Sequence, residues 1–185
     1  MAWCHAGRAC QPGETMLPFN GLRDGRSTVS NYGGACKVPK LMVVPEDATI
    51  RNSRFFFQID AGVGMSRSNN REDVAIVQFM LATLQGIYFS GDAVRMDGIA
   101  GPRTNAAILA FQQFMKVPFP GLPKSPALAT DSAVDPTKAP IGAHRGNSTL
   151  GLLNLMTAKH VFKWPDITGE AVYQNGGVKL SGIFG

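Results

Sequence analysis

Histidine and cysteine are the side chains of this sequence best suited to bind a metal ion or to act as a nucleophile. The three histidines, His5, His144 and His160, lie far apart in the chain. A helix that holds zinc commonly presents two histidines as His-x-x-x-His, and no such pair occurs. The histidine spacing therefore predicts no metal site.

The cysteines are Cys4, Cys10 and Cys36. Cys4, His5 and Cys10 could belong to a zinc site, but the spacing fits no standard zinc finger and no fourth ligand is evident. Cys4 and Cys10 could instead close a short disulfide loop, or the thiols could be free, and the odd number leaves at least one unpaired within the chain. We expect no metal and no cofactor.

Paired carboxylates could carry a different chemistry, because hydrolysis of a glycosidic bond needs two of them on either side of the bond. The pairs Glu46-Asp47 and Glu72-Asp73 are adjacent in sequence, which fits a solvated turn and a helix start better. Residues 32–36 hold a thiol without a histidine to activate it. No phosphate-binding loop or dinucleotide motif occurs. We expect that the chain is not an enzyme.

The sequence predicts three helices, at residues 70–85, 102–116 and 148–160. Residues 70–85 have Asn70 as a suitable N-cap and apolar residues at spacings of three and four, namely Val74, Val77, Leu81 and Leu84. Residues 102–116 begin with Pro102, which suits a first helical turn, and carry a stripe made of Ala107, Phe111 and Phe114 with Ile108 and Met115 beside it. Residues 148–160 can be capped by Ser148 or Thr149 and present Leu150, Leu153 and Met156.

Short strands are predicted on both sides of these helices. Residues 41–44 and 55–59 are apolar runs, and the three phenylalanines at 55–57 suit a pleated surface. Three consecutive phenylalanines cannot all face one core, so we expect at least one to pack on the helices or on another subunit. Residues 178–180 are a further short strand candidate.

Residues 96–112 contain a turn that leads into the second helix. Asp97-Gly98 predicts the turn, since glycine readily takes a positive φ. Ile99 is expected to be a buried anchor and Phe111 to fill the core. Gly101 allows close approach of the backbone, and the Thr104 hydroxyl can bond within the first helical turn.

This segment resembles the central motif of the peptidoglycan-binding domain family of the small three-helix type. The shared pattern is Asp-Gly, two residues, Gly-Pro, a basic residue and Thr, followed by a helix with Ala-Ala and Phe-Gln. The pairs Val77-Gln78 and Leu84-Gln85 are similar to the Val/Leu-Gln pair of the family's earlier helix. The family also has a weaker second copy of the turn, which resembles Val134-Asp135, Ile141-Gly142 and residues 148–153 here.

The resemblance implies a mainly α fold, with a three-helix bundle at 70–160 and a long proline-rich insertion at 117–147 that the family lacks. Residues 1–69 are then an extended arm with short strands, and residues 161–185 a C-terminal extension. A further departure is Ala100, where the family often has a phenylalanine-like residue. The motif residues Asp97, Gly98, Gly101, Thr104 and Phe111 are expected to be architectural.

A ligand groove for sugar and peptide would need aromatic faces together with amide or charged groups. Five residues near the motif could supply these groups and are the candidate peptidoglycan contacts. They are Tyr88, Phe89, Arg95, Arg103 and Gln112.

The charge pattern bears on possible partners. The net charge is +5, without a basic run or a stripe of interleaved basic and aromatic residues, so we expect no nucleic-acid binding. No apolar stretch is long enough to span a membrane, and the N-terminus has no secretory pattern. A wall-binding protein without such a signal reaches the wall by another route, which indicates a virion location, or a cytoplasmic one before assembly.

These expectations lead to one main hypothesis and two alternatives. The main hypothesis is a non-enzymatic component of a large assembly, such as a phage tail or baseplate, whose peptidoglycan-binding-like domain contacts the cell wall or docks subunits. Its terminal arms would contact other subunits. The alternatives are a peptidoglycan-targeting accessory of a lytic system, and a small cell-wall hydrolase with an unrecognised catalytic part.

Overall fold

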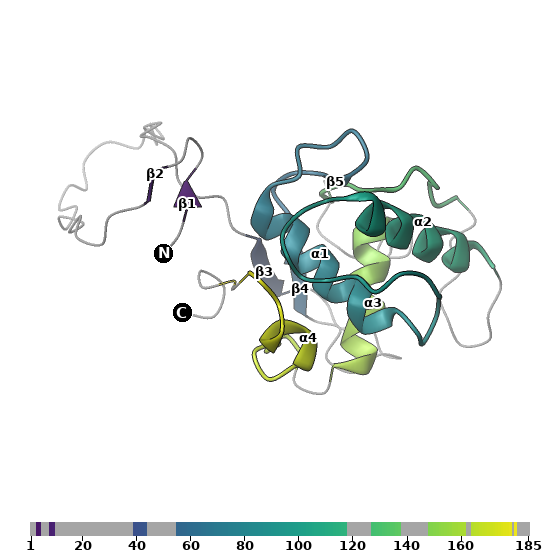
Figure 1. Cartoon of the computed structure of the whole chain (residues 1–185). Coiled ribbons are helices and arrows are strands. Elements are labelled where there is room, and N and C mark those ends of the chain that lie inside the picture. The colour runs from purple at the N-terminus through teal and green to yellow at the C-terminus, as the bar shows by residue number, and fades with distance from the viewer. Residues whose placement is uncertain are drawn as a thin grey trace, which may run out of the picture. The chain divides into compact units, whose positions relative to one another are not determined.

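A computed structural model gives the fold of the chain (Figure 1). The described residues are 3–4, 8–9, 39–43, 55–117, 127–137, 148–161, 164–178 and 180. The chain divides into two compact units, Met1–Lys37 and Val38–Gly185. The second unit therefore begins well before residue 70, where the sequence predicted the domain boundary.

In the first unit, strands β1 (Trp3–Cys4) and β2 (Arg8–Ala9) form a short antiparallel pair, with Cys4 opposite Arg8. Cys10 and Cys36 lie outside the described residues. The alternatives of a zinc site, a disulfide and free thiols stay predictions.

Helix α1 (Arg71–Leu84) is the central helix of the second unit and contacts α2, α3 and α4. Its residues 73–81 are buried without interruption, so the predicted apolar face extends to most of the helix surface. The buried carboxylate of Asp73 accepts hydrogen bonds from the backbone N–H groups of Asp60 and Ala61, at 3.2 and 2.9 Å. Burial raises the pKa of Asp73, although these two hydrogen bonds act in the opposite direction.

Helices α2 (Pro102–Lys116) and α3 (Thr149–His160) lie within a residue or so of their predicted bounds. Both follow from local chemistry, because Pro102 fits the first turn of α2 and the Ser148 side chain accepts a hydrogen bond from Gly151 N at 3.0 Å. Helix α1 packs against each of them (Figure 1).

Three antiparallel strand pairs accompany the helices, so the described residues form a mixed α/β structure and not the mainly α fold expected from the sequence. Besides β1–β2, strand β3 (Lys40–Val43) pairs with β4 (Phe55–Gln58), and β5 (Val63–Gly64) pairs with β6 (Ala133–Val134). The last pair joins the segment before α1 to residues of the predicted proline-rich insertion.

The sequence predicted that at least one of the three phenylalanines packs on the helices or on another subunit. In the structure, these phenylalanines pack on the helical core. Phe56 and Phe57 are buried, and the Phe57 ring meets Trp164 edge to face at 5.0 Å. Asn154 of α3 accepts a hydrogen bond from Phe57 N at 2.7 Å and donates one to Phe57 O at 3.1 Å. A polar side chain of α3 thus continues the hydrogen bonding of β4, which ties the strand to the helix.

The C-terminal segment also packs on the core. It contains a short helix that the sequence did not predict, α4 (Ala171–Gln174), which contacts α1. Val178 and Leu180, the described part of the predicted strand 178–180, are buried and lie outside any strand. Leu180 N donates to the Tyr173 hydroxyl at 3.2 Å. None of the described helices is long and apolar enough to cross a membrane.

Candidate functional site

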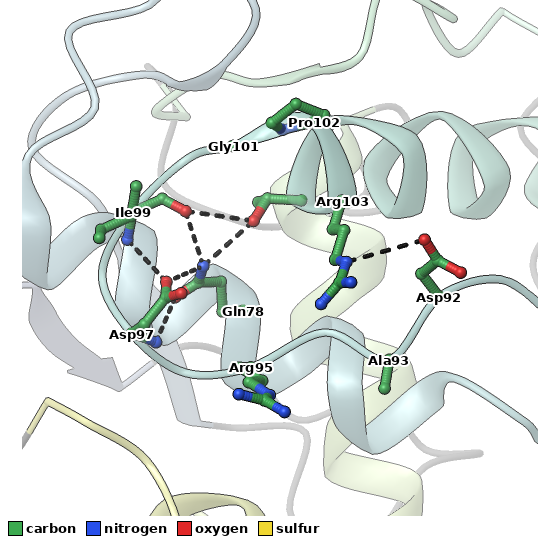
Figure 2. A pocket seen from close by; sticks show the side chains of 10 residues that line it. Gln78, Asp92, Ala93, Arg95, Asp97, Ile99, Gly101, Pro102 and Arg103 are labelled. Carbon is green, nitrogen blue, oxygen red and sulfur yellow. Dashed lines mark hydrogen bonds and ion pairs between the residues drawn. The ribbon is translucent and has the colours of Figure 1, made fainter.

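Gln78 of α1 holds the turn that precedes α2. Its buried side-chain oxygen accepts hydrogen bonds from Asp97 N and Gly98 N, at 3.0 and 2.8 Å. Its amide nitrogen lies 2.8 Å from Asp97 Oδ1, 3.0 Å from the Ile99 carbonyl and 3.1 Å from Thr104 Oγ1 (Figure 2). One amide group therefore satisfies both sides of the turn and the first turn of α2.

The turn itself requires glycine. Gly98 has φ +74°, and a Cβ atom at this position would lie 2.6 Å from Arg71 Cγ and 3.0 Å from Val178 Cγ2. Asp97 Oδ1 accepts a further hydrogen bond from Ile99 N at 2.9 Å. The Ile99 side chain is 67% exposed, so the prediction that it is a buried anchor is wrong. The Gln78 hydrogen bonds anchor the turn instead.

A second turn is built in the same way by Gln112 of α2. The Gln112 oxygen accepts from Ser132 N at 3.1 Å, and its amide nitrogen lies 3.0 Å from Asp131 Oδ1, 2.8 Å from the Ala133 carbonyl and 3.1 Å from Thr149 Oγ1. Asp131 Oδ1 also accepts from Ala133 N at 3.1 Å.

The two turns share spacing as well as bonding. Each glutamine lies 19 residues before its aspartate and 21 before the carbonyl that it binds. Ser132 has φ +59° where the first turn has Gly98 at φ +74°. The second copy therefore begins at Asp131, and the prediction that it begins at Val134-Asp135 is wrong. Residues 141–142 lie outside the described part.

A surface pocket of about 430 Å³ opens beside the first turn. Arg95 comes from the connection between α1 and α2, and Arg103 from the first turn of α2 (Figure 2). The pocket is lined by Gln78, Asp92, Ala93, Arg95, Asp97, Ile99, Gly101, Pro102, Arg103 and Thr104. Of the predicted contact residues, the structure brings together Arg95 and Arg103 here.

Gln85, just after α1, places the segment that carries Asp92 and Arg95. Its amide nitrogen donates to the carbonyls of Gly91 and Asp92, at 2.9 and 2.8 Å, and its oxygen accepts from Val94 N at 3.1 Å. Asp92 Oδ2 lies 3.7 Å from Arg103 Nε, and the two side chains are 80% and 66% exposed. An ion pair of this length and exposure is weak.

The other predicted contact residues lie elsewhere. Gln112 is fully buried within the second turn, out of reach of a ligand. Phe89 packs against Phe111, with ring centroids 6.1 Å apart. The Tyr88 hydroxyl lies 2.6 Å from His160 Nε2, at the end of α3. Burial raises the pKa of Tyr88. The pKa of His160 is lowered, mainly by burial and to a smaller extent by the positive charge of Lys159.

A smaller pocket of about 180 Å³ lies beside the second turn. It is lined by Leu128, Ala129, Asp131, Ala133, Asp135, Pro136, Ser148 and Thr149. Arg67 pairs with two of these carboxylates, at 2.6 Å from Asp135 and 3.3 Å from Asp131. The lining of the second pocket thus holds two carboxylates and no basic side chain, whereas the lining of the first holds two carboxylates and two guanidinium groups.

Sequence reasoning missed five lining residues, namely Gln78, Asp92, Ala93, Ile99 and Pro102. The recurrence of a glutamine 19 residues before an aspartate in both copies is a signal that could have identified Gln78. Within the described ranges, no group of three or more His, Cys, Asp and Glu side chains could hold a metal ion.

Comparison of the chain with protein-family models, with curated proteins and with solved structures gives no match.

Proposed function

We propose that this chain is a non-enzymatic cell-wall contact protein whose second unit carries a three-helix, peptidoglycan-binding-like domain. The observation that carries the proposal is the pair of glutamine-held turns, at Asp97 and at Asp131. Each turn places a threonine, Thr104 or Thr149, at the start of the next helix. The motif by which the sequence resembles the family thus corresponds to a repeated, hydrogen-bonded architecture.

The chemistry around the first turn suits recognition better than catalysis. Asp97, the carboxylate nearest the turn, bonds to Gln78 and to Ile99 N, so both its charge and its orientation serve the turn. The pocket combines two guanidinium groups with the apolar Ile99 side chain, and a shallow groove that holds a sugar and peptide polymer needs such a mixture.

The proposal is tested by co-sedimentation of the full chain with purified bacterial sacculi. We expect saturable retention in the pellet and no loss of turbidity of the suspension. Sacculi digested to soluble fragments should compete for binding. The test variant is Gln78→Leu, which removes the bonds that hold the first turn and should lower retention. Absence of retention by the folded protein would overturn wall contact, and clearing of the suspension would favour the hydrolase alternative.

A specific observation also favours the assembly part of the hypothesis. In strand β3, all four residues are exposed, and Val43 is 74% exposed beside Leu41 and Met42. Strand β3 pairs with β4, and no further strand of the described residues pairs with it. An exposed apolar edge strand is a template for pairing with another chain. We propose that this edge docks subunits in a larger particle such as a phage tail or baseplate.

A further inference from the structure

We infer that the Arg95–Arg103 pocket is a carboxylate-binding subsite and that Asp92 occupies it as an internal competitor when no ligand is bound. The ligand class is a sugar-linked peptide with a free carboxylate. This inference rests on the proposed function for the source of the ligand, while the carboxylate chemistry rests on the pocket itself.

The pocket is lined by two guanidinium groups, of Arg95 and Arg103, and by two carboxylates, of Asp92 and Asp97. Arg95 is exposed and makes no hydrogen bond or ion pair within the described part of the chain. Arg103 has the loose contact with Asp92, at 3.7 Å. The second carboxylate of the lining, Asp97, is bonded to the Gln78 amide and to Ile99 N. Two guanidinium groups are therefore available to an incoming anion.

Guanidinium groups favour a carboxylate because their planar N–H donors match its two oxygens. Arg103 extends from α2 toward the segment that carries Asp92, Ala93 and Arg95, so a bound carboxylate would take the place now held by Asp92 (Figure 2). Ile99 and Pro102 add apolar surface on the rim. The volume of about 430 Å³ lies within the usual range of small-ligand pockets.

The second turn provides an internal comparison. There the guanidinium of Arg67 already holds Asp135 at 2.6 Å and Asp131 at 3.3 Å, so the pairing of guanidinium and carboxylate is complete within the chain. The neighbouring pocket has less than half the volume of the first, about 180 against 430 Å³. At the first turn, the guanidinium of Arg103 pairs with the exposed carboxylate of Asp92 at the longer distance of 3.7 Å.

The experiment is a calorimetric titration of the full chain with N-acetylmuramyl-L-alanyl-D-isoglutamine, which has one free carboxylate, and with its methyl ester. We expect the acid to bind about tenfold more tightly than the ester, which is about 1.4 kcal/mol, because the ester lacks the negative charge that strengthens hydrogen bonds to the guanidinium groups. Arg95→Ala with Arg103→Ala should remove this preference. Asp92→Asn should raise the affinity for the acid about twofold or more, because it removes the competing carboxylate.

The matched control is Lys116→Ala with Lys159→Ala, which removes the same charge from exposed positions at the far ends of α2 and α3. This control should keep the preference for the acid. Equal binding of acid and ester, or an equal loss in the control, would overturn the subsite. If the folded chain fails to bind sacculi but keeps the arginine-dependent preference for the acid, the wall function fails and the subsite stands. If the double arginine variant binds sacculi like the parent, the subsite fails and the wall function stands.

Discussion

At the scale of single residues, the two turns differ in one position that the backbone constrains. Gly98 and Ser132 both have positive φ, at +74° and +59°. Only the glycine site is crowded by the start of α1, where a Cβ atom would meet Arg71 Cγ at 2.6 Å and Arg71 O at 3.0 Å. A side chain is therefore accommodated at position 132 but not at position 98, although both positions have the same local backbone conformation.

This difference predicts opposite outcomes for two substitutions. Gly98→Ala should lower the free energy of unfolding by roughly 1–3 kcal/mol, because it adds left-handed strain and a steric overlap. Ser132→Gly should stay within about 1 kcal/mol of the parent, because relief of strain and added unfolded-state entropy oppose each other. Urea denaturation followed by circular dichroism measures both. A Gly98→Ala variant as stable as the parent would contradict this account of the turn.

At the scale of elements, three helices are placed by polar side chains that reach the backbone of a neighbouring segment. Gln78 of α1, Gln112 of α2 and Asn154 of α3 each satisfy backbone groups that would otherwise be buried without partners. About one turn after Asn154, helix α3 also contains a buried polar side chain that satisfies no neighbouring group among the described residues. Thr157 of α3 is fully buried, and its hydroxyl has no hydrogen-bond partner in the described structure.

The contact between the end of α3 and the α1–α2 connection predicts a pH dependence. Burial lowers the pKa of His160 below its ordinary value of 6.5, so between these two pKa values the unfolded chain binds more protons than the folded one. The contribution of His160 to stability is therefore present above pH 6.5 and is lost as the pH falls toward its folded-state pKa.

We expect the denaturation midpoint to fall between about pH 7.5 and about pH 5.5, and to fall less in a His160→Gln variant. The buried Asp73 has a raised pKa and gives the opposite slope at lower pH, so the comparison with the variant isolates His160. Identical slopes in parent and variant would show that His160 does not contribute.

At the scale of the whole molecule, the exposed strand β3 is the feature that bears on assembly. Leu41, Met42 and Val43 are all exposed, and burial of such an edge by a second chain would remove apolar surface from water. Where the docked subunit is a second copy of this chain, the proposal predicts association of the isolated protein with itself.

Sedimentation velocity over a range of concentrations should reveal this association, and Val43→Lys should weaken it by about tenfold or more, because charges on an edge strand oppose pairing. Ile87→Lys is the matched control, since Ile87 is 52% exposed but lies in the α1–α2 connection. A parent protein that stays monomeric at every concentration would contradict docking of a second copy through this edge.

Local signals in the sequence determined the three longer helices, α1, α2 and α3. Pro102 and Ser148 define helix starts by their own chemistry, and the spacing of Val74, Val77 and Leu81 indicates a helix before any tertiary contact is known. The Asp97-Gly98 turn was predictable for the same reason, since glycine at positive φ is a local requirement.

Only the tertiary structure decided which residues share a site. Arg95 and Arg103 meet in one pocket because Gln78 and Gln85 fix the connection between α1 and α2, whereas Gln112 is buried in the core. A hydrogen bond between residues 19 positions apart leaves no mark in the neighbouring residues, because it depends on how the helices pack, and only the repeated glutamine–aspartate spacing points to it. For the same reason the sequence misplaced the second turn, whose aspartate is identified by its bond to Gln112 and not by its neighbours in the chain.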